Sequence, residues 1–162
     1  MLAIAGVVCA MFVFNAVYPA VSRSSGAIVS VAGKVDDRIK SQIRIVHATG
    51  ELDGYGNWQD TDGDGDFDVF LWVKNVGASR LVAIEESDVF FGKEADFVRI
   101  PCEVDAGGSF PRWSWQLEND TEWKPTATLK LTIHFSSALG SDTYFVKVIA
   151  SNGVSDEHFF SM

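Results

Sequence analysis

The first 22 residues, Met1 to Ser22, carry no charged side chain, and the first charge along the chain is Arg23. Asn15 is the only strongly polar side chain between Met1 and Val21. At a helical rise of about 1.5 Å per residue, this stretch would span roughly the hydrocarbon core of a bilayer. We therefore expect an apolar helix that is buried either in lipid or against copies of itself.

The helical spacing of apolar residues continues after the chain becomes polar at Ser24. Charged residues fill the other helical faces, and Gly50 suits a helix stop. The spacing predicts one helix from about residue 2 to about residue 47, softened at Pro19 and Gly26. The apolar stripe of its amphipathic part recurs at steps of three and four residues, at Ile28, Val31, Ala32, Val35, Ile39, Ile43 and Val46.

The rest of the chain alternates apolar and polar residues in short runs that turn residues separate. In the segment 126–135, Leu129, Leu131 and Ile133 fall on one face, with polar or charged residues between them. About seven such runs predict an antiparallel β-sandwich. The predicted fold class is α+β, with a long N-terminal hydrophobic helix over residues 1–48 and an antiparallel Ig-like β-sandwich over residues 49–162.

The composition narrows the classes of function. With 22 acidic and 13 basic residues, the formal net charge is -9, so phosphate groups repel the chain and nucleic acid is not an expected partner. The two cysteines, Cys9 and Cys102, lie in the apolar stretch and in the predicted sandwich, so we expect no disulfide between them. The sequence contains no C-x-x-C motif or Cys/His cluster that would indicate zinc.

An acidic loop over residues 60–68 is the sharpest chemical signal. Position twelve of an EF-hand calcium loop, counted from Asp60, is Leu71 instead of a bidentate Glu, and a strand is predicted to follow, so the loop is not an EF-hand. The spacing nevertheless predicts a structural Ca2+ site in a β-loop, with a solvated acidic turn as the alternative. The predicted ligands occupy alternate positions around Gly65, and they are Asp60, Asp62, Asp64, Asp66 and Asp68.

Other candidate sites are less specific. Asn119 begins the only N-x-S/T triplet and is a candidate glycosylation site. The five tryptophans either form a ligand platform or, as we favour, belong to the core and to subunit contacts. His47, His134 and His158 lie on separate predicted elements, and the sequence places none of them beside a nucleophile. Without a recognisable catalytic motif, we expect that the protein is not an enzyme.

Several segments resemble the archaellum family of type IV pilin-like proteins, which includes archaellins and the related stator-type components of the same machine. These segments are AVYPAVSRSSGAIVS (16–30), DDRIKSQIRIVHATGELD (36–53), VFLWVKNVG (69–77), WKP (123–125) and VKVIASNGVSDEHFF (146–160). A long uncharged N-terminal helix that runs into a β-sandwich is the plan of this family. Together the segments are spread along the chain from residue 16 to residue 160.

The resemblance implies a filament subunit for motility. The helix would lie in the cytoplasmic membrane until a pilin-type peptidase removes a leader. An assembly platform would then move it into an extracellular filament of copies of the chain or of related subunits. Small residues such as Ala3 and Gly6 let such helices approach closely. The positions expected in the helical core are Leu2, Ile4, Val8, Met11, Phe12, Phe14, Tyr18, Val21, Ile28, Val35 and Ile39.

Two alternatives to a filament subunit stay open. The first is a stator-type or minor component of the same machine, which remains at the cell envelope and binds the surface layer through its sandwich. The second is a membrane-anchored, calcium-dependent binding module that is unrelated to motility. Both differ from the filament subunit in location, because neither would be a major constituent of filaments sheared from cells.

Overall fold

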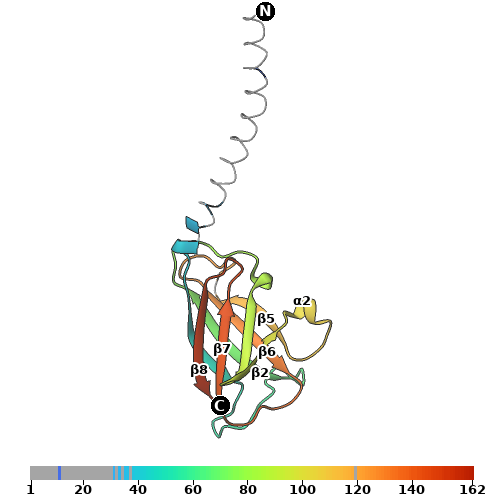
Figure 1. Cartoon of the computed structure of the whole chain (residues 1–162). Helices are drawn as coiled ribbons and strands as arrows, with labels where there is room; N and C mark the ends of the chain where they lie inside the picture. Colours follow the sequence, from blue (N-terminus) through green and yellow to red (C-terminus); the bar gives the residue numbers. More distant parts are fainter. Residues whose placement is uncertain (1–10, 12–30, 32, 34, 37, 119) are drawn as a thin grey trace, which may run out of the picture. The chain divides into compact units, whose positions relative to one another are not determined.

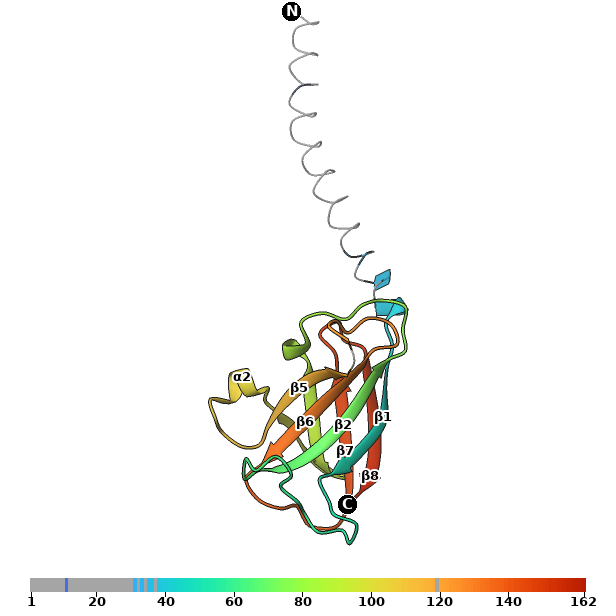
Figure 2. The same cartoon turned by 180° about the vertical axis from the view of Figure 1, so that it is seen from behind.

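The computed structural model describes residues 11, 31, 33, 35, 36, 38–118 and 120–162 of the chain. The chain divides into two compact units, Met1–Asp37 and Arg38–Met162. The second unit is a β-sandwich of two four-stranded sheets, whose strands are seen from opposite sides in Figures 1 and 2. This sandwich carries almost all of the described residues.

The first sheet has the strand order β1-β2-β6-β5. Its strands are β1 (Ile43–Gly50), β2 (Phe67–Asn75), β6 (Thr128–Phe135) and β5 (Arg112–Glu118). Every neighbouring pair is antiparallel. The register places Asp68 of β2 directly opposite His134 of β6, which is the pairing on which the candidate site is built.

The second sheet has the strand order β4-β3-β7-β8 and is also antiparallel throughout. Its strands are β4 (Asp96–Ile100), β3 (Asp88–Lys93), β7 (Thr143–Ile149) and β8 (Ser155–Ser161). Two short helices lie in the connections (Figure 2): η1 (Ile84–Glu86) precedes β3, and α2 (Glu103–Ala106) links β4 to β5.

Apolar side chains at every second position of the strands form the core between the two sheets. In β6, Leu131 and Ile133 are fully buried, and in β7 Val146 and Val148 are equally buried. Apolar area removed from water contributes roughly 25 cal/mol per Å² to folding, so these alternating positions fix which face of each strand points inward. Trp113 lies with them in the core.

The two sheets are joined where the edge strands β1 and β8 meet. The backbone N–H of Ile45 in β1 donates a hydrogen bond of 2.7 Å to a carboxylate oxygen of Asp156 in β8. The side-chain amide of Asn152, just before β8, lies 2.8 Å from Ser41 Oγ, just before β1. These contacts close one side of the sandwich and protect two edges that would otherwise pair with other strands.

The predicted α+β fold class with a long N-terminal helix is wrong, because the described chain is mostly β-sheet and its helices are short. Residues 43–47, predicted as the last part of the helix, belong to strand β1. This strand has a register shift between Ile45 and His47, which is a β-bulge. The bulge leaves Val46 exposed, so the apolar step from Ile43 to Val46 imitates helical spacing.

Most of the predicted helical-core positions lie outside the described residues, namely Leu2, Ile4, Val8, Phe12, Phe14, Tyr18, Val21 and Ile28. Met11, Val35 and Ile39 are described, and all three are exposed, at 64%, 50% and 78%. Among the described residues, no helix has the length and hydropathy of a membrane span.

Candidate functional site

The acidic loop between β1 and β2 is closed by hydrogen bonds to its own backbone. The carboxylate of Asp60 accepts hydrogen bonds from the backbone N–H groups of Gly63, at 2.7 Å, and of Gly65, at 3.0 Å. Both glycines have positive φ angles, of 79° and 84°, which residues with a side chain rarely adopt. The glycines therefore allow the tight path that brings alternate carboxylates to one side of the loop.

Four of the five predicted metal ligands come together in two groups, the first made by Asp60, Asp62 and Asp64 and the second by Asp64, Asp66 and His134. One carboxylate oxygen from each of Asp60, Asp62 and Asp64 lies within 4.8 Å of the others, and all three residues are exposed. The pKa of Asp62 is raised overall: a hydrogen bond from the Asp64 backbone lowers it, but desolvation and nearby acidic side chains outweigh this bond. The cluster thus offers oxygen ligands of the kind that hard cations prefer.

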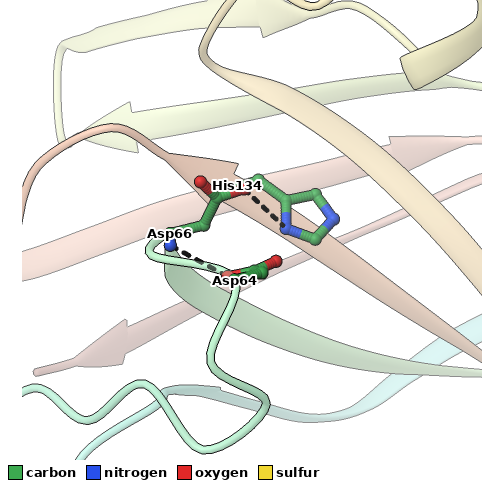
Figure 3. A group of neighbouring side chains, drawn as sticks. All are labelled: Asp64, Asp66 and His134. Carbon is green, nitrogen blue, oxygen red and sulfur yellow. Dashed lines mark hydrogen bonds and ion pairs between the residues drawn. The ribbon is translucent and has the colours of Figure 1, made fainter.

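Asp66, which immediately precedes β2, and Asp68, the second residue of β2, are both buried. Arg112 donates a hydrogen bond of 3.0 Å to the carboxylate of Asp66. The same carboxylate lies 3.8 Å from His134 Nδ1 (Figure 3). Burial raises the pKa of Asp66, and neighbouring carboxylates add to this, whereas Arg112 and His134 lower it. Asp66 therefore already has a cationic partner from within the chain, whereas Asp60, Asp62 and Asp64 form no ion pair with any residue in the part of the chain that the structure describes.

Asp68, His134 and Ser114 form a hydrogen-bonded chain across three neighbouring strands, β2, β6 and β5. His134 Nδ1 lies 2.8 Å from Asp68 Oδ1, and His134 Nε2 lies 2.9 Å from Ser114 Oγ. The side chains of Asp68 and His134 are 5% and 13% exposed. The hydrogen bond to Asp68 raises the pKa of His134 above its ordinary value and outweighs burial, which lowers it.

This chain corrects the interpretation that no histidine lies beside a nucleophile, because Ser114 and His134 are in hydrogen-bond contact. The order Ser–His–Asp is that of a serine nucleophile and its base. Ser114, however, lies inside the regular strand β5 opposite Thr132, and not at the strained strand-to-helix turn that presents such a nucleophile. We interpret the chain as a polar tie between strands, and the expectation that the protein is not an enzyme stays a prediction.

A groove of about 680 Å³ lies beside this chain and reaches the acidic loop. Lys130 Nζ lies 4.0 Å from the centre of the Phe70 ring, so the ammonium group covers one face of that aromatic side chain. The groove is therefore lined by both polar and apolar side chains. Its lining includes Asp62, Phe70, Ser114, Gln116, Lys130 and His134.

The remaining predicted features are distributed over the fold. Asn119 lies outside the described residues. Trp113 and Trp123 are fully buried in the core, and Trp58 packs partly buried against it. Trp58 Nε1 donates a hydrogen bond of 2.9 Å to the carbonyl of Leu139. Three of the five tryptophans thus serve packing, as the usual place of large aromatic side chains predicts.

Comparison with known proteins gives one full-length relative. No family model matches the chain. A protein of Archaeoglobus fulgidus that is named only as uncharacterized is 27% identical over 169 residues, which cover 99% of this chain and 93% of the relative. The similarity therefore extends over the N-terminal segment as well as the sandwich.

Two solved structures from Sulfolobus acidocaldarius are similar to the sandwich. The archaellum periplasmic stator protein FlaG has a TM-score of 0.57 and 22% identity, covering 74% of this chain and 99% of that chain. The complex of the archaellum periplasmic stator proteins FlaF and FlaG has a TM-score of 0.56 and 22% identity, covering 74% and 88%. At this level of identity, the likeness shows that this chain shares its β-sandwich fold with archaellum stator proteins.

Proposed function

We propose that this chain is a stator-type component of an archaellum-like machine and that it acts in the cell envelope. The observation that carries the proposal is the fold shared with the stator protein FlaG, 99% of whose solved chain is covered. The resemblance of segments such as 69–77 and 146–160 to the archaellum family supports the same assignment from the sequence side. In this role the protein bears load and catalyses no reaction.

The internal construction of the sandwich suits a part that must resist force. Leu131 and Val146 are completely buried in the core between the two sheets, and close-packed interiors have low compressibility. The hydrogen bond from Ile45 to Asp156 joins the sheets at one edge. The Asp68–His134–Ser114 chain adds a side-chain tie across three strands of the first sheet. Through these ties, load on one strand would be shared by its neighbours.

The observations favour a stator-type component over a filament subunit. The filament subunit rested on a long N-terminal helix, most of whose positions lie outside the described residues. Two of the similar solved structures are of archaellum stator proteins. The acidic surface, with a formal net charge of -9 for the chain, keeps an envelope domain soluble and argues against nucleic acid as a partner.

We propose two partners for this role. The first is a related archaellum subunit, since one similar structure is a complex of FlaF with FlaG. The second is the surface layer of the cell, because a component that resists rotation must be attached to a fixed structure. Both partners place the sandwich outside the cytoplasmic membrane.

Deletion of the gene in its own host separates the stator-type role from the filament role. Cells that lack a stator-type component should still carry filaments but should not swim, because the motor has no fixed counterpart. Cells that lack a major filament subunit should carry no filaments. Electron microscopy reports filament number, tracking reports swimming, and complementation with the wild-type chain is the control. Normal swimming, or loss of the filaments, would contradict the proposal.

A further inference from the structure

The outer face of the second sheet carries two rows of side chains, each with one residue from every strand. Listed in the strand order β4, β3, β7 and β8, the first row is Phe97, Gly92, Phe145 and Phe159, and we call it the aromatic row. In the same order, the second row is Arg99, Phe90, Lys147 and Glu157, and we call it the charged row.

The aromatic row is a continuous apolar ridge. Gly92 has no side chain, and the ring of Phe97 reaches across it to the ring of Phe145, with the ring centres 4.8 Å apart. The ring centre of Phe145 in turn lies 5.1 Å from that of Phe159. Phe145 is covered by these neighbours, whereas Phe97 and Phe159 are 48% and 50% exposed. Large rings thus stand in solvent at both edges of one sheet face, as is typical of contact surfaces.

The charged row and Asp88, which lies two residues before Phe90 on β3, are together electrically balanced although the chain is strongly acidic. Arg99 forms an ion pair with Asp88, and Lys147 Nζ lies 3.2 Å from Glu157. These two pairs cancel, while the whole chain has a formal net charge of -9. Copies of an acidic chain repel each other over most of their surface. A balanced face with exposed rings is therefore where two copies can approach with the least repulsion.

The charged row is also complementary to itself. A two-fold axis parallel to the strands, above the gap between β3 and β7, places β4 of one copy over β8 of the other and keeps each row opposite itself. Arg99 then faces Glu157 of the second copy, and Phe90 faces Lys147 of the second copy, which suits an ion pair and a cation–π contact. An axis perpendicular to the strands through this row would instead place Arg99 opposite Arg99.

We propose that this face binds a second copy of the same chain, in a two-fold dimer whose axis runs parallel to the strands. In this arrangement Phe97 of each copy packs against Phe159 of the other. Four strands spaced about 4.8 Å apart present a face of roughly 350–400 Å² per copy, which is small for a permanent interface. The dimer is therefore weak, and its affinity is concentrated in the edge rings and the two charge pairs.

A photo-crosslinking amino acid at position 159 of the full chain identifies the occupant directly. Irradiation should give a covalent product of two chains, and mass spectrometry should map the link from position 159 to β4 of the second copy. The same amino acid at position 55, where Tyr55 is 93% exposed in a loop, is the control. A yield at position 159 no higher than at position 55, or links only to a different protein, would overturn the proposal.

A charge reversal between copies tests the direction of the two-fold axis. Arg99→Glu alone places like charges opposite each other and should weaken dimerisation of the full chain at least about tenfold in sedimentation equilibrium. Glu157→Arg alone should weaken it similarly. The double variant should recover part of the loss, because the charges are again opposite between the copies while Asp88 and Lys147 each keep a like-charged neighbour within their own copy. Arg80→Glu, which breaks the exposed pair with Glu122 elsewhere on the surface, is the matched control. Failure of the double variant to recover would refute the proposed axis.

The inference stands on the geometry of this face and not on the proposed stator-type role. A chain that dimerises through this face but is dispensable for swimming would refute the function and leave the dimer intact. A chain that is needed for swimming but gives no crosslink between copies would refute the dimer and leave the proposed function intact.

Discussion

Replacement of His134 by alanine should be among the most destabilising changes on the outer face of the first sheet. The substitution leaves the Asp68 carboxylate, 5% exposed, without the imidazole that now contacts it. Loss of one member of a buried charged pair costs about 3–5 kcal/mol. Ser114→Ala removes a single hydrogen bond to His134 and should cost only about 1 kcal/mol. The exposed His47 ring lies 5.4 Å from the Trp72 ring, centre to centre, and is tilted against it by 31°, so His47→Ala should cost about 1 kcal/mol or less.

The same pair should make stability depend on pH. The pKa of His134 is raised in the folded chain, chiefly by its hydrogen bond to Asp68, above the unfolded value near 6.5. The folded state therefore binds the proton more tightly than the unfolded state. The stabilisation that the protonated His134 adds to the folded state is fully present below about pH 6.5. It is lost as the pH rises through the raised pKa that His134 has in the folded chain. His134→Ala should remove this part of the pH dependence, and Ser114→Ala should preserve it.

Chemical denaturation followed by tryptophan fluorescence, in a buffer with a chelator, measures these effects on the full chain. The unfolding free energies of wild type and His134→Ala should differ most at about pH 5.5 and should approach each other at about pH 9. A difference that is constant with pH, or a cost for His134→Ala no larger than for His47→Ala, would refute the reasoning about the buried pair.

Three further predictions follow from particular contacts. Ca2+ should raise the melting temperature, and a chelator should reverse this, in the wild type but not in Asp62→Asn; equal melting temperatures with and without Ca2+ would remove the metal prediction. Gly92→Ala should cost about 1–3 kcal/mol in denaturant titrations, because the new Cβ would meet backbone atoms of Asp96 and Phe97. Gly140→Ala is the control and should not destabilise the chain, because the space around Gly140 is open. Equal costs for the two variants would contradict the clash. Asn75→Ala should cost about 2–4 kcal/mol of unfolding free energy. The buried side-chain amide donates hydrogen bonds to the carbonyls of Ser79 and Trp123 and accepts one from the N–H of Gly77. Unchanged stability would show that these hydrogen bonds make no net contribution.

Strands with regular alternation could be predicted from sequence, and the irregular strand could not. In β6, Leu129, Leu131 and Ile133 are buried at every second position, so the period of two is plain. In β1, the bulge after Ile45 shifts the pattern by one residue, and the apolar spacing then fits a helix as well as a strand. Only the pairing of β1 with β2 resolves the difference.

The candidate site was predictable where its residues are close in sequence. The clustering of Asp60, Asp62 and Asp64 follows from their alternate spacing around glycines. Sequence gave no sign of the Asp68–His134–Ser114 chain, because 66 residues separate Asp68 from His134. The one available signal was the outward position of His134 in the alternation of β6, and the strand register is needed to place Asp68 opposite it.

The stator-type role is tested most directly by the amount of this chain in sheared filaments relative to the washed cell envelope. Quantitative mass spectrometry of the two fractions measures this ratio, with the major filament subunit as an internal reference. The account predicts that the chain is concentrated in the envelope and is at most a trace constituent of the filaments. A chain abundant in sheared filaments, in proportion to the major subunit, would contradict it.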